Sequence, residues 1–299
     1  MSVLVVGSVA LDSIDTPFGK AKRVLGGSAT YFSVSASFFT KVNLVAVVGD
    51  DFPKKYISLL KKRRIDTAGL EIAEGKTFAW KGRYGYDFNN AETIYTHLNV
   101  FQNFAPKIPR EYKKSDLVFL ANIDPDLQLS VMKQVGKVQL IACDTMNYWL
   151  KNKRRAVLEV AKTVDIFLLN ESEARQMSGE ANLLKAGRSI LRMGPSKVVV
   201  KKGEHGVLLF SRGYIFSAPA YILEEINDPT GAGDTFAGGF MGYLGRKKRI
   251  ADADIRKAII YGTVMASYTV EDFSLRRLVH LGPNDIEKRY KDYRRLTKY

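Results

Sequence analysis

The stretch with the clearest chemical signature is residues 228–236, which reads Asp-Pro-Thr-Gly-Ala-Gly-Asp-Thr-Phe. A strand is predicted over residues 221–226 before it, and an apolar helix is predicted from Ala232 through Leu244 after it. The proline and the two glycines let the backbone turn sharply and come close to a ligand. The first amides of a helix lack partners inside the helix, and the helix dipole favours an anion beside them. The pattern therefore predicts an anion site at the start of this helix.

Asp234 lies inside this predicted anion site. A carboxylate would repel the bound anion, so its presence needs a chemical reason. Accepting the proton of an attacking hydroxyl during phosphoryl transfer is such a reason. The alternative is an ordinary acidic residue in a first helical turn, where such residues are common. The local string leaves both interpretations open.

The elements that would position this site alternate between strands and helices. Short runs rich in Val, Ile and Leu predict strands buried on both faces, at residues 3–6, 44–48, 117–120, 140–142, 166–169 and 198–200. Helical spacing occurs at residues 54–64, 153–162 and 181–193. This alternation predicts an α/β fold, with a mostly parallel central sheet flanked by helices, built as one domain over residues 1–299.

Two aromatic-rich stretches interrupt this pattern. Residues 77–87 and 93–100 alternate polar and apolar side chains, and Asn89-Asn90 lies between them. Such alternation predicts a two-stranded ribbon. The ribbon is either a small β lid over a site or an edge hairpin. We favour a lid formed by about residues 14–24 and 77–100, because exposed aromatic side chains on a protruding ribbon need a surface to cover.

Composition narrows the class of protein. Of the 299 residues 46% are hydrophobic, which suits a large core, and Cys143 is the single cysteine, so no intrachain disulfide can form. No apolar run approaches the length of a membrane span, and the first apolar run reads as a strand rather than a signal peptide. We therefore expect a cytoplasmic protein that does not bind membranes.

The chain is strongly basic, with a formal net charge of +15. Its basic residues fall in separate runs: residues 61–64, 151–155, 246–249 and the tail from 288. The charge could serve nucleic-acid binding, or it could steer an anionic substrate. No aromatic-interleaved stripe accompanies the runs, so we expect solvated helix ends and no nucleic-acid partner.

The motif at residues 228–236 closely resembles the C-terminal signature of the ribokinase-like, or PfkB, family of sugar and nucleoside kinases. Four other pieces follow in the order that this family shows: residues 7–12, Gly26-Gly27, residues 170–173 and residues 202–206. The resemblance covers the whole chain. It implies a transfer of phosphate from ATP to a hydroxyl, with Mg²⁺ as a cofactor.

The resemblance also implies roles for individual residues. Asp234 would be the catalytic base, and the amides of Gly231, Ala232 and Gly233 would form the anion hole. The substrate would contact Asp12, Gly26, Gly27, Ser28 and Tyr31. Thr230, Lys201, Gly203 and Gly206 would line the ATP site, with Asn170 and Glu173 organising Mg²⁺ and phosphates largely through water. The helix at residues 261–267 would flank the adenine, and Asp228 would belong to a loop that holds a monovalent cation such as K⁺.

Position along the predicted sheet adds Asn147 as a further substrate candidate. Asp144 and Asn147 follow the strand at 140–142, where α/β sheets bind ligands, although the two could equally form a turn. Structural alternatives exist for other residues as well. Asn170 and Glu173 could simply cap a helix, Gly203 and Gly206 could form a hairpin turn, and Asp12 could cap a turn.

Tyr31 marks a departure from the family pattern, which usually has asparagine at this position. Ala10 likewise stands where the family often has asparagine. Losing amide side chains removes hydrogen-bonding partners for a polyol, whereas an aromatic ring could stack on another ring. We therefore expect a cyclic sugar or a nucleoside as the acceptor rather than ribose.

The sequence thus predicts an ATP-dependent carbohydrate kinase that phosphorylates a hydroxyl of a small sugar-like acceptor. A nucleoside kinase is the alternative of the same class. A non-catalytic sugar or nucleotide sensor is the alternative of another class. The aromatic lid could also pair with a second copy and form a homodimer.

Overall fold

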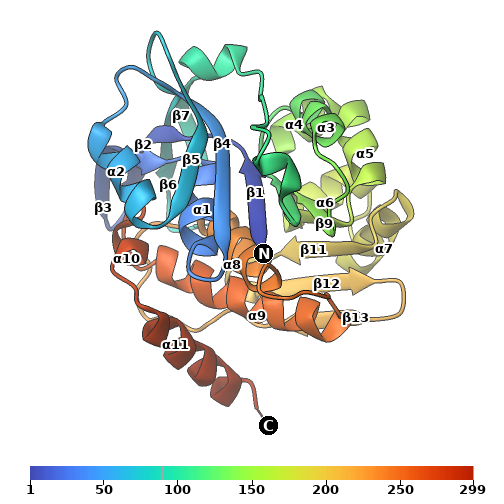
Figure 1. The fold of residues 1–299 in the computed structure, drawn as a ribbon. Helices are drawn as coiled ribbons and strands as arrows, with labels where there is room; N and C mark the ends of the chain where they lie inside the picture. The colour runs from blue at the N-terminus through green and yellow to red at the C-terminus, as the bar shows by residue number, and fades with distance from the viewer. Residues whose placement is uncertain (89–90, 299) are drawn as a thin grey trace.

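Two sheets form the framework of the computed structural model, which describes residues 1–88 and 91–298 (Figure 1). The larger sheet has nine strands in the order β13-β12-β11-β10-β9-β8-β1-β4-β5. Its strands are β1 Ser2–Val6, β4 Lys41–Gly49, β5 Ile65–Ala73, β8 Leu117–Leu120, β9 Leu140–Cys143, β10 Ile166–Asn170, β11 Lys197–Lys201, β12 Val207–Ser211 and β13 Ile215–Ala218. Pairing is parallel from β5 to β11, and β12 is antiparallel to both of its neighbours. The predicted mostly parallel sheet is therefore confirmed.

Helices cover both faces of this sheet (Figure 1). One face packs against α1 Ser28–Ala36, α2 Lys54–Lys62, α8 Ala232–Leu244, α9 Asp252–Thr269, α10 Arg276–Val279 and α11 Pro283–Leu296. The other face packs against α3 Pro125–Gln134, α4 Asn147–Asn152, α5 Arg154–Thr163, α6 Glu171–Ser178 and α7 Leu183–Arg192. In β1, Val3 and Val5 belong to the first core while Leu4 and Val6 belong to the second. Successive side chains of a strand point to opposite faces, so an unbroken apolar run is what a strand buried on both faces requires.

The smaller sheet contains the predicted lid segments. Its four strands are β2 Ala10–Thr16, β3 Gly19–Gly26, β6 Ala79–Tyr84 and β7 Ala91–His97, in the order β3-β2-β6-β7. The pairs β2–β3 and β6–β7 are antiparallel, and β2 and β6 join them in parallel. Asn89 and Asn90, which lie between the two predicted ribbon strands, are outside the described residues. A homodimer through this sheet stays a prediction, with the largely exposed β7 as one edge.

Two of the strands predicted from the sequence differ from the structure. The strand predicted over residues 221–226 is wrong, because these residues have no regular secondary structure. Ile222 is 74% exposed there, and the apolar pattern of the segment has no neighbouring strand to pair with. The ribbon strand predicted over 93–100 runs instead from Ala91 to His97, and a 3-10 helix, Asn99–Asn103, follows it.

The carboxyl ends of the parallel strands meet at one edge of the large sheet. Asp144 follows β9, Asn170 ends β10, and Lys201 ends β11. Three short 3-10 helices complete the described elements: Asn99–Asn103, Tyr112–Lys114 and Gly203–His205. This edge therefore brings together polar residues that are far apart in the sequence.

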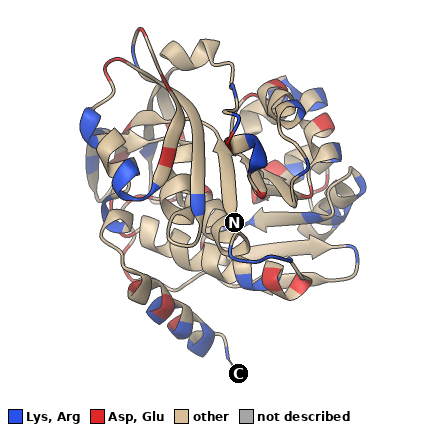
Figure 2. Ribbon diagram, viewed as in Figure 1, with Lys and Arg blue, Asp and Glu red and all other residues tan. Residues whose placement is uncertain are grey.

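Basic residues are spread over several separate elements (Figure 2). The runs predicted from the sequence lie at the end of α2, across α4 and α5, after α8, and along α11. This distribution matches solvated helix ends better than one continuous basic face. Across residues 1–88 and 91–298, no helix combines the length and the apolar character needed to cross a membrane.

Candidate active site

The segment that precedes α8 forms the predicted tight turn. Gly231 is the residue before the helix, and its φ of 76° places it in the left-handed region that favours glycine. A Cβ at Gly231 would also lie 2.4 Å from the ring of Tyr31. Both the backbone angle and the available space therefore require glycine here. We call residues 228–234 the anion loop.

Ala232 and Gly233 are less constrained by their surroundings than Gly231. The N–H of Ala232 donates to the Pro229 oxygen at 3.2 Å, so the turn itself uses this predicted anion-hole donor. A Cβ on Gly233 would lie 3.1 Å from Lys201 Nζ, which is the flexible end of a side chain. Gly231 is thus more sensitive to substitution than Gly233, a difference that the motif alone does not predict.

Asp234 lies in the first turn of α8 and is partly exposed. Desolvation by the surrounding protein raises the pKa of this carboxyl from 3.8 to about 7. The negative charge of Asp144 raises the pKa further, and the positive charge of Lys201 lowers it. A carboxyl group with a pKa near 7 can accept a proton and release it again near neutral pH.

Lys201 is the central cation on this side of the loop. Its Nζ lies 2.6 Å from Asp144 Oδ2, and the two side chains are 16% and 5% exposed. Burial and the Asp144 charge raise the pKa of Glu173 to about 8, and the charge of Lys201 opposes this rise. We call Asp144, Glu173, Lys201 and Asp234 the lysine cluster. Three carboxyl groups here share one lysine, so a further cation would favour their ionised forms.

Asn170 and Glu173 form a reciprocal cap at the start of α6. The Glu173 N–H donates to Asn170 Oδ1 at 2.9 Å, and the Asn170 N–H donates to Glu173 Oε2 at 2.7 Å. The capping alternative is therefore correct for this pair. It does not exclude the phosphate role, because the cap also fixes Glu173 within the lysine cluster.

Asn147 was predicted to bind the substrate together with Asp12, but its side chain lies beside the cap of α6. Its Nδ2 donates to Ser172 Oγ at 3.1 Å, and Ser172 Oγ donates to Asn170 Oδ1 at 2.9 Å. The structure thus groups Asn147 with residues predicted for the nucleotide. Its assignment to the substrate stays a prediction.

Gly203 and Gly206 flank the short turn between β11 and β12. The hairpin-turn alternative is therefore also correct, since β11 and β12 are antiparallel neighbours. Lys201 ends β11 immediately before this turn. The predicted nucleotide loop thus continues directly from the lysine cluster.

Asp12 occupies the other side of the anion loop, on β2. The side chain is 5% exposed, and its Oδ2 accepts the N–H of Gly27 at 3.3 Å. A Cβ on Gly26 would lie 1.8 Å from the same oxygen, so glycine at 26 leaves the space for the carboxylate. Burial raises the pKa of Asp12 to about 7, and the charges of Asp228 and Asp234 add to this rise. The carboxylate of Asp12 is therefore fixed by a hydrogen bond from Gly27 rather than by a local turn.

Ser28 begins α1 and is turned towards Ser8. The Ser28 N–H donates to Ser8 Oγ at 3.0 Å, and the two hydroxyl oxygens lie 3.1 Å apart. Ser28 is 7% exposed, so a ligand would meet it only after a rearrangement of this pair. Its substrate-binding role stays a prediction.

Tyr31 packs beneath Gly231 and is 1% exposed. Its ring is therefore not open to stacking in this structure. The buried hydroxyl has no hydrogen-bond partner among the described residues. Burial raises the pKa of this hydroxyl well above its usual value, and the charges of Asp228 and Asp12 act in the same direction. A ligand would therefore reach this hydroxyl, like that of Ser28, only after a rearrangement.

Asp228 anchors the start of the anion loop. Its Oδ1 accepts the N–H of Thr230 at 2.9 Å, and its Oδ2 accepts the N–H of Ser274 at 3.1 Å. Thr230 Oγ1 lies 3.3 Å from the hydroxyl of Tyr84, which belongs to strand β6 of the small sheet. We call Asp12, Tyr31, Tyr84 and Asp228 the aspartate–tyrosine cluster. Of the lid aromatics, Tyr84 thus reaches the anion loop, whereas Tyr86 is 85% exposed.

Asp144 is the main site residue whose contact the sequence did not reveal. Its position after a buried strand at the carboxyl edge was a usable signal, but the Lys201 partner is 57 residues away. Thr269 is a second case, because its hydroxyl contacts that of Thr235 at 2.9 Å inside the core. No local spacing indicates either contact.

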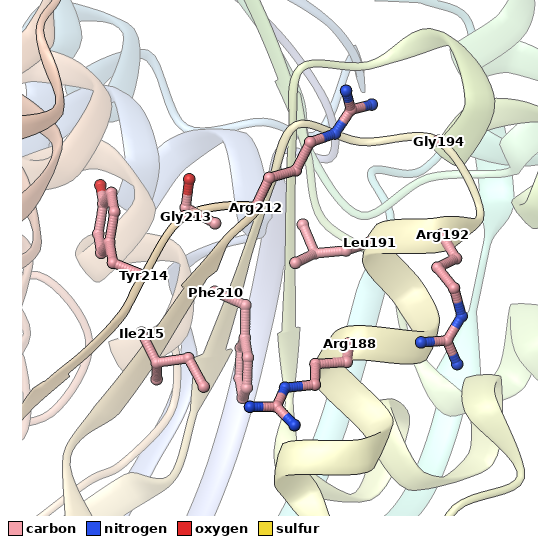
Figure 3. Close-up of a pocket in the computed structure, with 10 residues that line it drawn as sticks. Arg188, Leu191, Arg192, Gly194, Phe210, Arg212, Gly213, Tyr214 and Ile215 are labelled. Carbon is pink, nitrogen blue, oxygen red and sulfur yellow. The ribbon is translucent and has the colours of Figure 1, made fainter.

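A separate cavity of about 750 Å³ lies between the end of α7 and the β12–β13 turn (Figure 3). It is at the opposite edge of the sheet from Lys201, since Ser211 lines it and pairs with Lys197 at the start of β11. In Figure 3, Arg212 points away from Arg188. The candidate active site at the anion loop is therefore separate from this cavity.

A glycine turn at a helix start, next to buried carboxylates and a lysine at the carboxyl edge of an α/β sheet, is an arrangement suited to phosphoryl transfer. The family model described as "pfkB family carbohydrate kinase" matches residues 2–279. The chain belongs to this family and is a kinase of the ribokinase type.

Individual relatives agree with this family assignment. A cytidine kinase of Thermococcus kodakarensis is 31% identical over 258 residues, which cover 84% of this chain and 91% of the relative. The solved nucleoside kinase of Methanocaldococcus jannaschii has a TM-score of 0.80 and 21% identity, covering 97% of this chain and 98% of that one. A ribokinase II of E. coli, solved in complex with ATP and Mg²⁺, has a TM-score of 0.75 and 20% identity, covering 97% and 99%. These two structures support the fold.

Proposed function

We propose that this protein transfers the terminal phosphoryl group of ATP to the primary hydroxyl of a nucleoside. The observation that carries the proposal is Asp234, a carboxyl group with a pKa of about 7 at the start of α8. Its pKa responds to Asp144 and Lys201, and its own charge acts on Asp12. Asp234 is thus the member of the lysine cluster whose charge also acts on the aspartate–tyrosine cluster.

The proposed reaction follows from this placement. Asp12 binds hydroxyls of the acceptor, because a carboxylate accepts two hydrogen bonds at once. Asp234 accepts the proton of the attacking hydroxyl as its oxygen bonds to the terminal phosphorus of ATP, and ADP leaves. Free amides of the anion loop stabilise the charge on the transferred group. Lys201 would neutralise part of the phosphate charge, and the turn at Gly203–His205 would lie along the nucleotide.

The residues present fit Mg²⁺ that is held mainly by phosphates and water. Mg²⁺ prefers oxygen ligands and is commonly bound through one or two carboxylates plus substrate phosphates. Across the described residues, no group of three or more His, Cys, Asp or Glu side chains could hold a metal by itself. Glu173 and Asp144 would supply the protein oxygens, directly or through water. Bound Mg²⁺ would offset phosphate charge, and the E. coli relative solved with ATP and Mg²⁺ supports this assignment.

Two considerations favour a nucleoside over a simple sugar. The relatives include a cytidine kinase and a nucleoside kinase, which were named for their acceptors. Tyr31 also stands where an amide is expected for polyol binding. We further propose that the small sheet acts as a lid over the acceptor, because Asp12 and Tyr84 come from its strands β2 and β6.

A screen of acceptors tests the proposal. Purified protein is supplied with ATP, Mg²⁺ and, separately, cytidine, uridine, adenosine, inosine, ribose and fructose, and phosphorylated product is measured directly. We expect turnover with at least one nucleoside, with cytidine first, and little with ribose. The D234N variant controls for contaminating kinases. Turnover confined to sugars would overturn the nucleoside assignment, and ligand binding without any turnover would favour the sensor.

A further inference from the structure

Residues 270–274, which follow α9, hold the start of the anion loop in place. The backbone oxygen of Val270 accepts the N–H groups of Asn227 and Asp228 at 2.8 and 3.3 Å. The N–H of Ser274 donates to Asp228 Oδ2 at 3.1 Å. Asp228 in turn fixes the N–H of Thr230, one residue before Gly231. A displacement of residues 270–274 would therefore reach the anion-loop amides that are proposed to bind the phosphate.

The same segment also contacts the small sheet. Ser274 Oγ donates to the Leu25 oxygen at 2.5 Å, at the end of β3. Phe273 packs with Ile14 and Ala21 from β2 and β3. Residues 270–274 are thus a junction between the anion loop and the sheet that carries Asp12.

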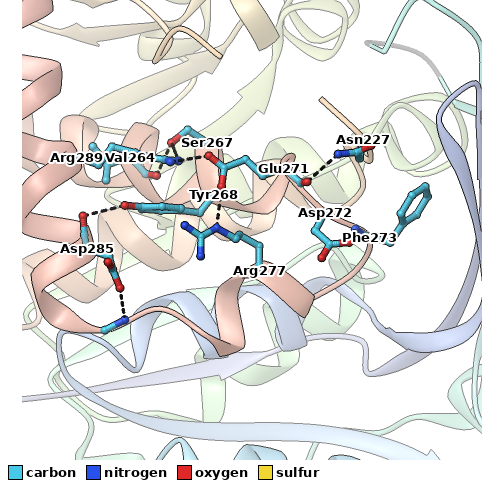
Figure 4. A network of polar contacts seen from close by, with 11 residues as sticks. Asn227, Val264, Ser267, Tyr268, Glu271, Asp272, Phe273, Arg277, Asp285 and Arg289 are labelled. Carbon is cyan, nitrogen blue, oxygen red and sulfur yellow. Dashed lines mark hydrogen bonds and ion pairs between the residues drawn. The ribbon is translucent and has the colours of Figure 1, made fainter. Parts of the chain in front are cut away.

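Glu271 connects this junction to the C-terminal helix (Figure 4). Its carboxylate accepts from Arg277 Nε at 2.8 Å and from Arg289 Nη2 at 2.5 Å. Its backbone oxygen accepts from Asn227 Nδ2 at 2.8 Å. A single residue therefore joins Asn227, the residue before the anion loop, through its main chain to two arginines through its side chain.

Arg289 is the more strongly held of the two arginines. Its side chain is 13% exposed, against 38% for Arg277. Its Nη1 donates to Ser267 Oγ at 3.0 Å, and its guanidinium carbon lies 3.4 Å from the centroid of the Tyr268 ring. Partial burial strengthens the ion pair relative to a surface pair, and the planar guanidinium can pair and stack at the same time.

Helix α11 supplies Arg289, and a second contact fixes the helix nearby. The Tyr268 hydroxyl donates to the Asp285 oxygen at 2.8 Å (Figure 4). Helix α11 lies beyond residue 279, where the family match ends. The contacts of the helix with α9 lie outside the segment that contains the anion loop, so they support the loop from a distance.

We infer that the Glu271–Arg289 pair positions the anion loop, and that α11 is a structural support of phosphoryl transfer. Both residues act through Val270, Asn227 and Asp228, so they are positioning residues. The kinetic part of this inference rests on the proposed function. Small displacements at a reacting centre lower the rate of the chemical step more than they weaken substrate binding.

Kinetics and hydrogen exchange of the full chain test the inference together. R289M removes the guanidinium but keeps an apolar side chain against Tyr268, and R289K keeps the charge. R295M is the matched control, because Arg295 lies on the same helix and pairs with Asp292 at the surface. We expect R289M to lower kcat with cytidine by about threefold to thirtyfold, the range of mutations along a coupling network. R289K keeps the ion pair with Glu271 but not the planar fork, so it should recover part of kcat, and R295M should change nothing.

Amide exchange of Asn227, Asp228 and Thr230 supplies the readout that needs no turnover. Faster exchange at these amides in R289M, with normal exchange in R295M, supports positioning even if the wild-type chain phosphorylates none of the acceptors tested. Unchanged exchange and unchanged kcat in R289M would overturn the inference. A lower melting temperature without either change would also overturn it, because the pair would then only stabilise the fold.

Discussion

The two sides of the anion loop treat buried charge in opposite ways. In the lysine cluster, Lys201 pairs with Asp144 and lowers the pKa of Asp234. In the aspartate–tyrosine cluster, the N–H of Gly27, rather than a cation, opposes the rise in the pKa of Asp12. In the proposed mechanism, the first side would bind ionised phosphates and the second would bind neutral hydroxyls. The difference indicates how a single loop can serve a charged donor and an uncharged acceptor.

The largest expected effect comes from the residue between the two sides. D234N keeps the size of the side chain but removes the base, and a positioned base contributes roughly 10²- to 10⁴-fold to the rate. We expect kcat to fall by about that factor while ATP affinity, measured by calorimetry, is largely retained. Near wild-type kcat in this variant would remove Asp234 from the mechanism.

Gly231 tests whether the loop geometry itself matters. In G231A the new Cβ would clash with the Tyr31 ring. Alanine also disfavours the left-handed φ that this position has, so the loop must shift. We expect kcat to fall by about 10²-fold, as for a displacement of about 1 Å at a reacting centre. G179A is the matched control, because Gly179 has a φ of 75° with open space around its Cβ. Equal activity of the two variants would show that the loop is an ordinary turn.

Asp12 tests the acceptor side. In D12N the acceptor KM should rise about tenfold to a hundredfold, because hydroxyls of the bound acceptor lose an ionised partner. The KM for ATP should stay nearly constant. A parallel rise in both constants would contradict the separation of the two sides.

The same variant carries a stability prediction. The folded-state pKa of Asp12 is about 7 against 3.8 for the ordinary group, so ionising it costs the folded state stability. This cost is absent below about pH 3.8, grows up to about pH 7 and is constant above. D12N should therefore gain more in melting temperature at pH 8 than at pH 5. An equal change at both pH values would argue that Asp12 is not desolvated.

Lys201 tests the lysine cluster through pH dependence. Asp234 must be ionised to act as a base, so kcat/KM should rise with pH through about 7. K201M removes the charge that lowers this pKa, and the rise should move to higher pH. D144N removes the charge that raises the pKa, and the rise should move to lower pH. Shifts in the same direction would show that the two residues do not act on Asp234 by charge.

Tyr31 should give the smallest effect. Y31F keeps the ring beneath Gly231 and removes the unpartnered hydroxyl. If the hydroxyl binds the acceptor, KM should rise about twofold to tenfold, as for the loss of one neutral hydrogen bond. Y31N, which also removes the ring, should alter the ranking of acceptors as well. An unchanged KM in Y31F with an unchanged ranking in Y31N would make Tyr31 a packing residue.

The sequence predicted the parts of the fold that depend on local pattern. Strands buried on both faces, such as Ser2–Val6 and Ile166–Asn170, appear as unbroken apolar runs. Residues 221–226 show the limit, because an apolar pattern does not reveal whether a neighbouring strand exists. Asp234 was identifiable because its motif is contiguous. Whether it and the other candidates carry the roles expected of them stays a prediction.

Contacts between distant segments were beyond sequence reasoning. Lys201 meets Asp144 because β9, β10 and β11 end at the same edge. Tyr31 meets Gly231, which lies far along the chain, because α1 packs on α8. The register of the sheet and the packing of helices decide these contacts. Residue type alone does not determine them.

The order of strands in the large sheet has a consequence for how the chain acquires its structure. Strands β8 to β13 lie side by side in the order of synthesis, so each can join a neighbour that has just formed. Strand β1 instead lies between β4 and β8, and its second neighbour is complete only at Leu120. Closing long loops before such pairings form slows folding. We therefore expect one edge of β1 to stay unpaired during translation until β8 has been made. A chaperone would bind this unpaired edge most readily at that stage.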